Sequence, residues 1–321
     1  MLGGAPVVVP FDKAMQVQDT ALVDVFTEEA RMISRRKDEP ASIVELFRRP
    51  DVARRAVDKA VGKYGELSEF SLRHGLFGHV QGPSLFKAQV ALGCYELFGA
   101  ERVLDMCAGW GVHLLGALAS PRVRRYLAFE PNTTLRAGHS AMVELFARRG
   151  GGAARDFEVQ YVPFERGRID AAERFDLVFT SPPYFDVEVY QSVAGAADHG
   201  GQSIASFSSL GGWLRGWLFP AMDRAFAALR EGGHMALYIN DFDGLSMCRP
   251  MVDHAASMPD CRWVGVVGVE GETGKTRPLW VWRKGAATEP LCPLYRALLP
   301  GLAATEAPAP AAAASSAAPA L

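Results

Sequence analysis

The stretch VLDMCAGWGVHLLGAL, residues 103–118, predicts a buried strand, a glycine turn and a helix. Its first residues are apolar on both faces, as in a parallel strand covered by helices. Asp105 closes the strand. Gly109 and Gly111 follow in the turn, where glycine permits a tight bend and the close approach of a ligand. Ligands of open α/β sheets bind at the carboxyl ends of strands, so the segment predicts a binding site at this turn.

The same alternation of apolar runs and helical stretches extends along the chain. Strands are predicted at 102–106, 125–130, 157–163, 175–181 and 234–240, and helices at 86–98, 111–119, 133–148, 207–230 and 249–257. This rhythm is typical of a parallel sheet with right-handed crossovers. Two late strands, 261–269 and 278–284, are joined by a short polar loop with two glycines, so we expect an antiparallel hairpin there.

Three segments divide the chain. Residues 1–80 are charged and predicted to be helical, residues 81–286 hold the α/β pattern, and residues 287–321 end in an Ala/Pro/Ser-rich stretch that is predicted to be a disordered tail. Between residues 31 and 63 there are ten lysines and arginines against five acids. This excess indicates either a solvated helical face or a surface that follows phosphates.

Composition excludes several classes of protein. The 321 residues are 49% hydrophobic and 22% charged, which rules out a collagen, a disulfide mini-protein and a fully disordered chain. A net charge of −2 supplies no global attraction to nucleic acid, so any such binding needs a local patch. Five cysteines without a CxxC pair favour reduced thiols, and the histidines lack metal-ligand spacing, so no metal is expected. The start lacks signal-peptide features and no long apolar run occurs, so we expect an intracellular protein without membrane contact.

A second carboxylate sharpens the interpretation of the glycine turn. Glu130 closes the second strand in LAFEPN, about 20 residues beyond the glycines, where a carboxylate can accept both hydroxyls of a ribose. The turn lacks the third glycine of a dinucleotide fingerprint, and Asp105 would repel a pyrophosphate. A cationic, phosphate-free nucleoside such as S-adenosylmethionine fits this charge better.

The segment FDLVFTSPPYFDVEVY, residues 175–190, carries a second chemical signal. A buried strand ends at Ser181, and Pro182 and Pro183 then form a stiff turn without N–H donors. An amino group on a flat ring can donate one hydrogen bond to the Ser181 side chain and one to the Pro182 carbonyl. Tyr184 supplies a face on which such a ring can stack.

Together these motifs resemble the class I S-adenosylmethionine-dependent amino-methyltransferases. DMCAGWG is similar to their acidic-x-x-x-Gly-x-Gly motif, Glu130 to their second-strand acid, and Ser-Pro-Pro-Tyr to their amine-binding turn. The resemblance covers about residues 82–285 and implies a Rossmann-like, seven-stranded, mostly parallel sheet with a C-terminal antiparallel hairpin and a helical N-terminal extension. The turn is closest to that of standalone methyltransferases of phages and large DNA viruses, except that Cys107 replaces a serine.

The resemblance also implies roles for individual residues. Asp105 would lie near the methionine moiety, Glu130 would bind the ribose, and Glu165 falls where the family often contacts the adenine. The cofactor-binding residues that it implies are Phe86, Lys87, Asp105, Cys107, Gly109, Gly111, Glu130 and Glu165. The catalytic residues that it implies are Ser181, Pro182, Pro183 and Tyr184, and candidate substrate contacts are Phe185, Lys275 and Arg277.

The implied reaction is methylation of an exocyclic amino group of a base in DNA, with cytosine favoured over adenine because the motif begins with serine. Two other interpretations stay open at this point: an RNA or protein-amide methyltransferase, and a catalytically silent module that binds without reacting. If residues 1–80 hold the substrate, their removal should abolish substrate affinity and spare cofactor binding.

Overall fold

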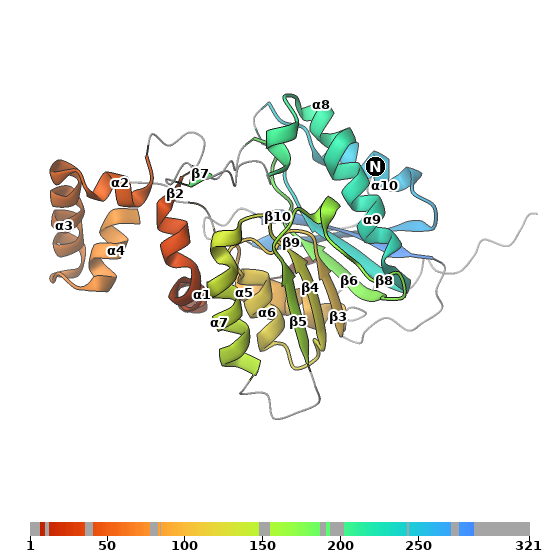
Figure 1. Cartoon of the computed structure of the whole chain (residues 1–321), viewed down its shortest axis with the longest axis horizontal. Coiled ribbons are helices and arrows are strands. Elements are labelled where there is room, and N and C mark those ends of the chain that lie inside the picture. Colours follow the sequence, from red (N-terminus) through yellow and green to blue (C-terminus); the bar gives the residue numbers. More distant parts are fainter. Residues whose placement is uncertain are drawn as a thin grey trace, which may run out of the picture.

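The computed structural model describes residues 7–9, 13–35, 41–77, 83, 85–147, 155–186, 191–192, 202–242, 244–270 and 276–285. Their centre is a sheet with the strand order β1-β9-β10-β8-β6-β3-β4-β5 (Figure 1). The strands are β1 (Val7–Val9), β3 (Arg102–Asp105), β4 (Arg125–Phe129), β5 (Asp156–Gln160), β6 (Phe175–Thr180), β8 (Leu229–Tyr238), β9 (Cys261–Glu270) and β10 (Thr276–Lys284). Strand β10 is antiparallel to both of its neighbours, and the other pairs are parallel.

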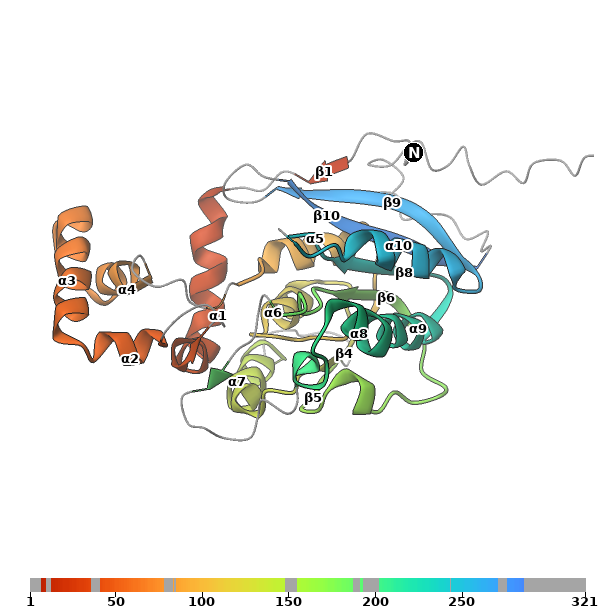
Figure 2. The ribbon, with the colours of Figure 1, turned by 90° about the horizontal axis from the view of Figure 1, so that it is seen from above.

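Helices cover both faces of the sheet. Figure 2 shows α5 (Ala88–Leu97), α6 (Val112–Ala119) and α7 (Arg136–Ala147) on one face, and α8 (Leu210–Trp213), α9 (Phe219–Ala227) and α10 (Cys248–Ser257) on the other. Alternate strand residues enter different cores: in β6, Leu177 and Phe179 face one side while Val178 faces the other. This period of two explains why the strands read as apolar on both faces.

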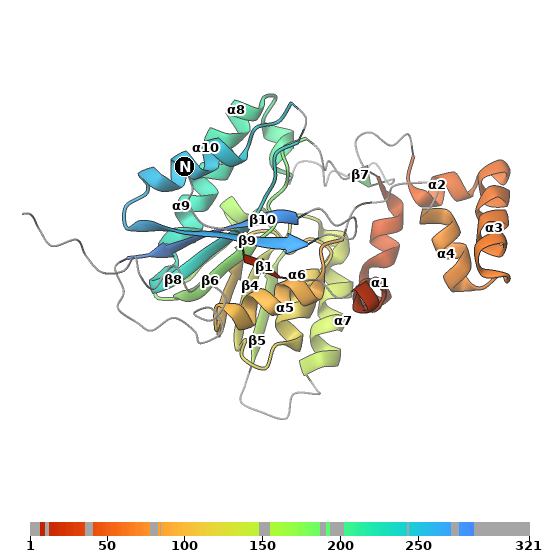
Figure 3. The same ribbon diagram turned by 180° about the vertical axis from the view of Figure 1, so that it is seen from behind.

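The predicted fold class is confirmed, with three differences. Strand β1, which pairs in parallel with β9 (Figure 3), was not predicted because three valines are too short a signal. The predicted helix 207–230 is divided by a π-helical turn, Leu214–Leu218, between α8 and α9. Strand β8 begins at Leu229 instead of residue 234, because a bulge that contains Gly232, with a φ of 76°, shifts its register against β6.

The N-terminal extension is helical, as predicted. It comprises α1 (Lys13–Ile33), β2 (Ser34–Arg35), α2 (Ile43–Phe47), α3 (Pro50–Tyr64) and α4 (Glu69–Phe77). Helices α2 to α4 form a lobe that projects beyond α1 (Figures 1 and 3) around its own small core, Ile43, Leu46, Val52, Ala56 and Leu76. We call these three helices the N-terminal lobe.

Local sequence signals set the boundaries of the lobe helices. Ser42 and Glu45 form a capping box at the start of α2, with the Ser42 N–H donating to Glu45 Oε2 at 2.8 Å. Pro50 occupies the first turn of α3, where its missing N–H is tolerated, and Gly65 ends α3 with a φ of 77°. The lobe is therefore specified by its own sequence.

Helix α1 connects the lobe to the rest of the protein. It packs against α7, where the Phe26 and Phe146 ring centroids lie 6.5 Å apart. Strand β2, at the end of α1, pairs with β7 (Gln191–Ser192), which follows the Ser-Pro-Pro-Tyr segment in sequence. The extension thus contacts the α/β domain through β1, α1 and β2.

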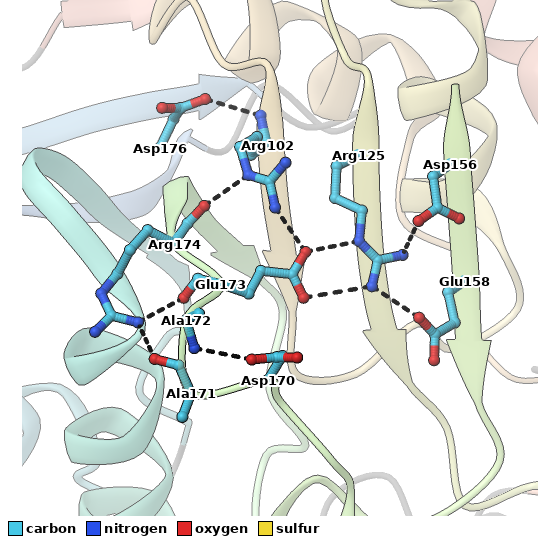
Figure 4. Close-up of polar contacts among 10 residues, drawn as sticks. All are labelled: Arg102, Arg125, Asp156, Glu158, Asp170, Ala171, Ala172, Glu173, Arg174 and Asp176. Atoms are coloured by element: carbon cyan, nitrogen blue, oxygen red, sulfur yellow. Dashed lines mark hydrogen bonds and ion pairs between the residues drawn. The ribbon is translucent and has the colours of Figure 1, made fainter. Parts of the chain in front are cut away.

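Ion pairs close the amino edge of the sheet, opposite the strand ends that carry the sequence motifs (Figure 4). The buried Arg125 guanidinium lies 2.8 Å from Glu173, 2.7 Å from Glu158 and 3.1 Å from Asp156. Arg102 also reaches Glu173, at 2.7 Å. The network joins three strands and the loop before β6, and its role is structural.

The C-terminal segment, residues 287–321 with its predicted tail, and Lys275 lie outside the described residues. The four cysteines in the described part of the chain are free thiols, as predicted. None of the described helices is long and apolar enough to cross a membrane. Within the described residues, no group of three or more His, Cys, Asp or Glu side chains is arranged to hold a metal ion.

Candidate cofactor turn and amine-binding turn

The two glycines of the turn after β3 serve different purposes. Gly109 has a φ of 53° and Gly111 a φ of 91°, a left-handed conformation that side chains rarely adopt. A Cβ at Gly111 would lie 2.9 Å from the His139 ring, whereas a Cβ at Gly109 would meet nothing within 4 Å. Gly111 is therefore required by packing, and Gly109 leaves open space above the turn.

Asp105 is an internal anchor of this turn. It is fully buried, and its Oδ2 accepts hydrogen bonds from the Tyr126 hydroxyl at 2.7 Å and lies 2.8 Å from His113 Nδ1. Its Oδ1 accepts from the Cys107 N–H at 3.0 Å. Asp105 thus fixes the shape of the turn from below.

Glu130 lies beside the glycine turn, at the end of β4. Its two carboxylate oxygens accept backbone hydrogen bonds from Gly109 and Asn132, each at 2.8 Å. Burial raises the pKa of Glu130 to about 7, and the two backbone donors oppose this rise. Glu130 therefore ties the end of β4 to the glycine turn, and it changes charge near neutral pH.

Phe86 and Lys87 lie where the chain enters α5. The Phe86 ring meets the rings of His113 at 4.8 Å and Tyr238 at 4.9 Å, both edge to face. Lys87 occupies the N-cap position of α5, without a side-chain hydrogen bond to the first turn. Phe86 is therefore packed between His113, just after the glycine turn, and Tyr238, at the end of β8.

Cys107 and Glu165 lie close enough to interact electrostatically. Burial, followed by the charges of Asp105 and Glu130, raises the pKa of the Cys107 thiol well above its usual value, and Glu165 adds to the rise. Cys107 is thus a poor nucleophile. Glu165 is exposed in the turn Phe164–Arg166 and accepts a hydrogen bond from Trp217 Nε1 at 3.2 Å.

The Ser-Pro-Pro-Tyr segment leaves β6 at the same edge of the sheet as the glycine turn, because β6 and β3 are paired and parallel. The Tyr184 hydroxyl donates to the Tyr238 carbonyl at 3.1 Å and lies 3.5 Å from Ser181 Oγ. The Tyr184 ring is 5% exposed and meets Phe242 edge to face at 5.2 Å. In this conformation Tyr184 orients Ser181, and its ring is covered.

The three residues proposed from sequence as substrate contacts are placed differently. Phe185 is buried, has a φ of 51° and packs against Trp213 at 6.1 Å. Arg277 is exposed at the start of β10, and its guanidinium lowers the pKa of the Tyr238 hydroxyl, which burial raises. Lys275 lies outside the described residues.

Sequence reasoning missed two residues that organise the site. Tyr238, at the end of β8, contacts Phe86 through its ring and Tyr184 through its carbonyl. Thr27, on α1, donates its hydroxyl hydrogen bond to the Trp110 carbonyl in the glycine turn at 3.0 Å. Tyr238 had a weak signal as a strand-end tyrosine, but 83 residues separate Thr27 from its partner, and no local pattern reveals such a contact.

A buried nitrogen near the turn is available to a ligand. Among the described residues, His113 Nε2 is buried and has no hydrogen-bond partner. Burial lowers the pKa of His139 to about 4, so this ring is neutral at physiological pH. Buried polar groups normally have partners, so His113 Nε2 is consistent with a polar ligand beside the turn.

Comparisons with known proteins identify structural neighbours only. No protein-family model and no curated protein matches the chain. A methyltransferase from Pyrococcus furiosus is 17% identical with a TM-score of 0.41, covering 74% of this chain and 99% of that one. The O-methyltransferase TomG from Streptomyces achromogenes, solved with S-adenosylmethionine, is 10% identical with a TM-score of 0.42, covering 86% and 100%.

A third neighbour is TrmN from Thermus thermophilus, with 18% identity and a TM-score of 0.39, covering 62% of this chain and 49% of that one. Similarity at this level assigns neither a substrate nor a cofactor.

Proposed function

We propose that the chain is an S-adenosylmethionine-dependent N-methyltransferase that acts on an exocyclic amino group of a base in DNA, with cytosine favoured over adenine. One observation carries the proposal. The glycine turn after β3 and the Ser-Pro-Pro-Tyr turn after β6 lie at the same edge of paired parallel strands, and Tyr238 links Phe86 to Tyr184. A methyl donor and an amine acceptor would therefore lie side by side.

The residues fit this cofactor. A Cβ at Gly109 would meet no atom within 4 Å, so the turn leaves room for close approach of a ligand, and Glu130 lies beside it with lone pairs for ribose hydroxyls. The carboxylates of Asp105 and Glu130 suit a cation and disfavour a pyrophosphate. When bound, S-adenosylmethionine supplies a methyl group activated by a positively charged sulfur.

The acceptor turn would work by positioning. Ser181 Oγ and the Pro182 carbonyl would accept the two hydrogens of the amine and so aim its nitrogen lone pair, and the Tyr184 hydroxyl at 3.5 Å would hold Ser181 in place. A base stacked on Tyr184 would displace Phe242 from the ring. A base in a duplex would also have to leave the stack to reach this turn.

Mass spectrometry of nucleosides tests the proposal. Unmethylated DNA is incubated with the purified chain and isotopically labelled S-adenosylmethionine, and labelled methylcytosine is the expected product. Label in adenine alone would change the assigned base but keep the reaction, whereas label only in RNA or protein would contradict DNA as substrate. Calorimetry with S-adenosylhomocysteine adds a separate check, because absence of binding would favour a silent module.

A matched pair of variants localises the chemistry. Ser181→Ala should lower the methylation rate about 100-fold, as loss of one orienting hydrogen bond at a reacting group does, with S-adenosylhomocysteine affinity unchanged. The control is Ser257→Ala, which removes an exposed hydroxyl that donates to His254 O at the end of α10 and should keep the wild-type rate.

A further inference from the structure

The N-terminal lobe carries a local excess of positive charge. From residue 48 to residue 63, six lysines and arginines stand against two aspartates, in a chain whose net charge is −2. Two further basic residues, Arg31 and Arg73, point inward and pair with Asp24 on α1. The excess of outward-facing positive charge therefore lies on α3 and on the residues just before it.

Arg55, Lys59 and Lys63 form a row along α3, which we call the basic ridge. They are spaced four residues apart, so they lie on one side of the helix, at steps of about 6 Å. All three are exposed, whereas Val52, Ala56 and Ala60 form the buried face of the same helix. Arg55 is also paired with Asp51 at 2.9 Å, on the surface. The ridge is long enough to follow consecutive phosphates.

Aromatic rings lie at the end of the ridge, where α3 turns into α4. Tyr64, Phe70 and His74, which we call the aromatic cluster, have ring centroids 4.2 to 5.6 Å apart. Phe70 is 49% exposed, and Lys63 Nζ lies 5.1 Å from the Tyr64 ring centroid. Phe70 and Lys63 thus both lie next to Tyr64 in one cluster, and nucleic-acid bases stack on exposed rings near cations.

The lobe is held firmly against the rest of the protein. Asp24 on α1 is buried and pairs with both Arg31 and Arg73, which joins α1 to α4. Helix α1 in turn bonds to the glycine turn through Thr27 and leads into β2, which pairs with β7. A ligand on the lobe would therefore be held at a fixed position relative to the two turns.

We propose that the basic ridge and the aromatic cluster form a docking surface for single-stranded or locally unpaired nucleic acid, with phosphates on the ridge and a base on Phe70. The proposal deepens the proposed function and rests on it for the identity of the substrate. The exposed Phe70 ring offers a stacking surface for a base, which anionic headgroups do not use, so we favour nucleic acid over an anionic membrane.

Fluorescence anisotropy of the full chain with a short labelled single-stranded oligodeoxynucleotide tests the surface without cofactor or methyl transfer. Lys59→Glu with Lys63→Glu should weaken binding at low salt about tenfold or more, and lower the dependence of binding on salt. The control pair is Arg124→Glu with Arg262→Glu, which makes the same charge change at exposed positions outside the lobe and should bind like the wild type.

A second pair of variants tests the stacking. Phe70→Ala should weaken binding about fivefold or more, whereas Phe70→Trp, which keeps a ring, should retain it. Circular dichroism confirms that each variant is folded. Equal binding by the ridge variant and its control would overturn the proposal, as would binding of phosphatidylserine vesicles without binding of the oligonucleotide.

The result of the binding test can be distinguished from the result of the methylation test. If the ridge variants methylate and bind DNA normally, the docking surface is wrong and the methyltransferase stands. If the wild type binds the oligonucleotide through the ridge and transfers no methyl group to DNA, the surface stands and the proposed function fails.

Discussion

The Tyr184 hydroxyl donates a hydrogen bond of 3.1 Å to the Tyr238 carbonyl, which joins the turn after β6 to the end of β8. The Tyr238 ring packs against Phe86 at 4.9 Å, on the side of the glycine turn. A single residue that sequence reasoning overlooked thus connects the two predicted sites. The Tyr238 carbonyl contacts Tyr184 and the Tyr238 ring contacts Phe86, so both the backbone and the side chain at the end of β8 take part in the connection.

Loss of this hydroxyl should impair turnover more than cofactor binding. Tyr184→Phe removes the hydrogen bond to Tyr238 and the contact with Ser181, so we expect an unfolding free energy lower by about 1 kcal/mol. We also expect a methylation rate about tenfold lower, with an unchanged Kd for S-adenosylhomocysteine. Urea unfolding, initial rates and calorimetry measure the three quantities.

A double-mutant cycle checks that Tyr184 acts through Ser181. If it does, the rate losses of Tyr184→Phe and Ser181→Ala should add up to more than the loss in the double variant. Fully additive losses would mean that the two side chains act independently.

The two glycines of the turn after β3 should respond differently to alanine. At Gly111 the positive φ and the His139 ring both oppose a side chain, so Gly111→Ala should lower the melting temperature strongly. At Gly109 only the backbone is strained, by about 1–2 kcal/mol, so Gly109→Ala should fold. Its Cβ would occupy the open space above the turn, and S-adenosylhomocysteine binding should be lost. Normal binding by folded Gly109→Ala would contradict a cofactor at this place.

The pH dependence of stability should report on Glu130. Its pKa is raised from 4.5 to about 7 in the folded protein, so the folded state binds more protons than the unfolded state between these values. The contribution of this carboxyl to the unfolding free energy is therefore largest below pH 4.5, and it is lost as the pH rises through about 7. Glu130→Gln should flatten this part of the stability curve, measured by thermal unfolding at several pH values.

Ligand affinity should follow the opposite trend. The ionised carboxylate accepts ribose hydrogen bonds best, so the affinity for S-adenosylhomocysteine should rise as the pH passes through about 7, and this rise should vanish in Glu130→Gln. Glu66→Gln, at an exposed position in the lobe, is the matched control for both measurements.

The amino edge of the sheet should matter for stability alone. Arg125→Met leaves the poorly exposed Glu173 with Arg102 as its remaining partner, and we expect a loss of about 2–4 kcal/mol. Arg122→Met breaks an exposed pair with Glu96 and should cost less than about 1 kcal/mol. Neither change should alter S-adenosylhomocysteine affinity, because both lie at the opposite edge from the glycine turn. Equal losses in the two variants would refute the structural role of the network.

The sheet could be predicted because its signals are local. Each of the seven predicted strands is a short apolar run bounded by turn residues, and each is found within five residues of its predicted start and within three of its predicted end. The bulge at Gly232 and the π-helical turn at Leu214–Leu218 escaped because both depend on packing against distant elements.

The site could be predicted only in part, for the same reason. Asp105, Gly109 and Glu130 follow from strand ends and glycine spacing, and the structure brings them together. The burial of Tyr184 and Phe185 follows from Phe242 and Trp213, which lie far along the chain. The contact of Thr27 with the glycine turn is likewise a product of the tertiary fold.

The pairing of β2 with β7 changes how a shortened protein should be interpreted. Deleting residues 1–80 would remove β2 and Thr27 together, which takes away the partner of β7 and a tether of the glycine turn. Such a deletion should therefore disturb donor and acceptor sides at once, contrary to the expectation that cofactor binding is spared. We therefore expect the α/β domain to depend on the extension, so point substitutions on the lobe are the informative way to locate its role.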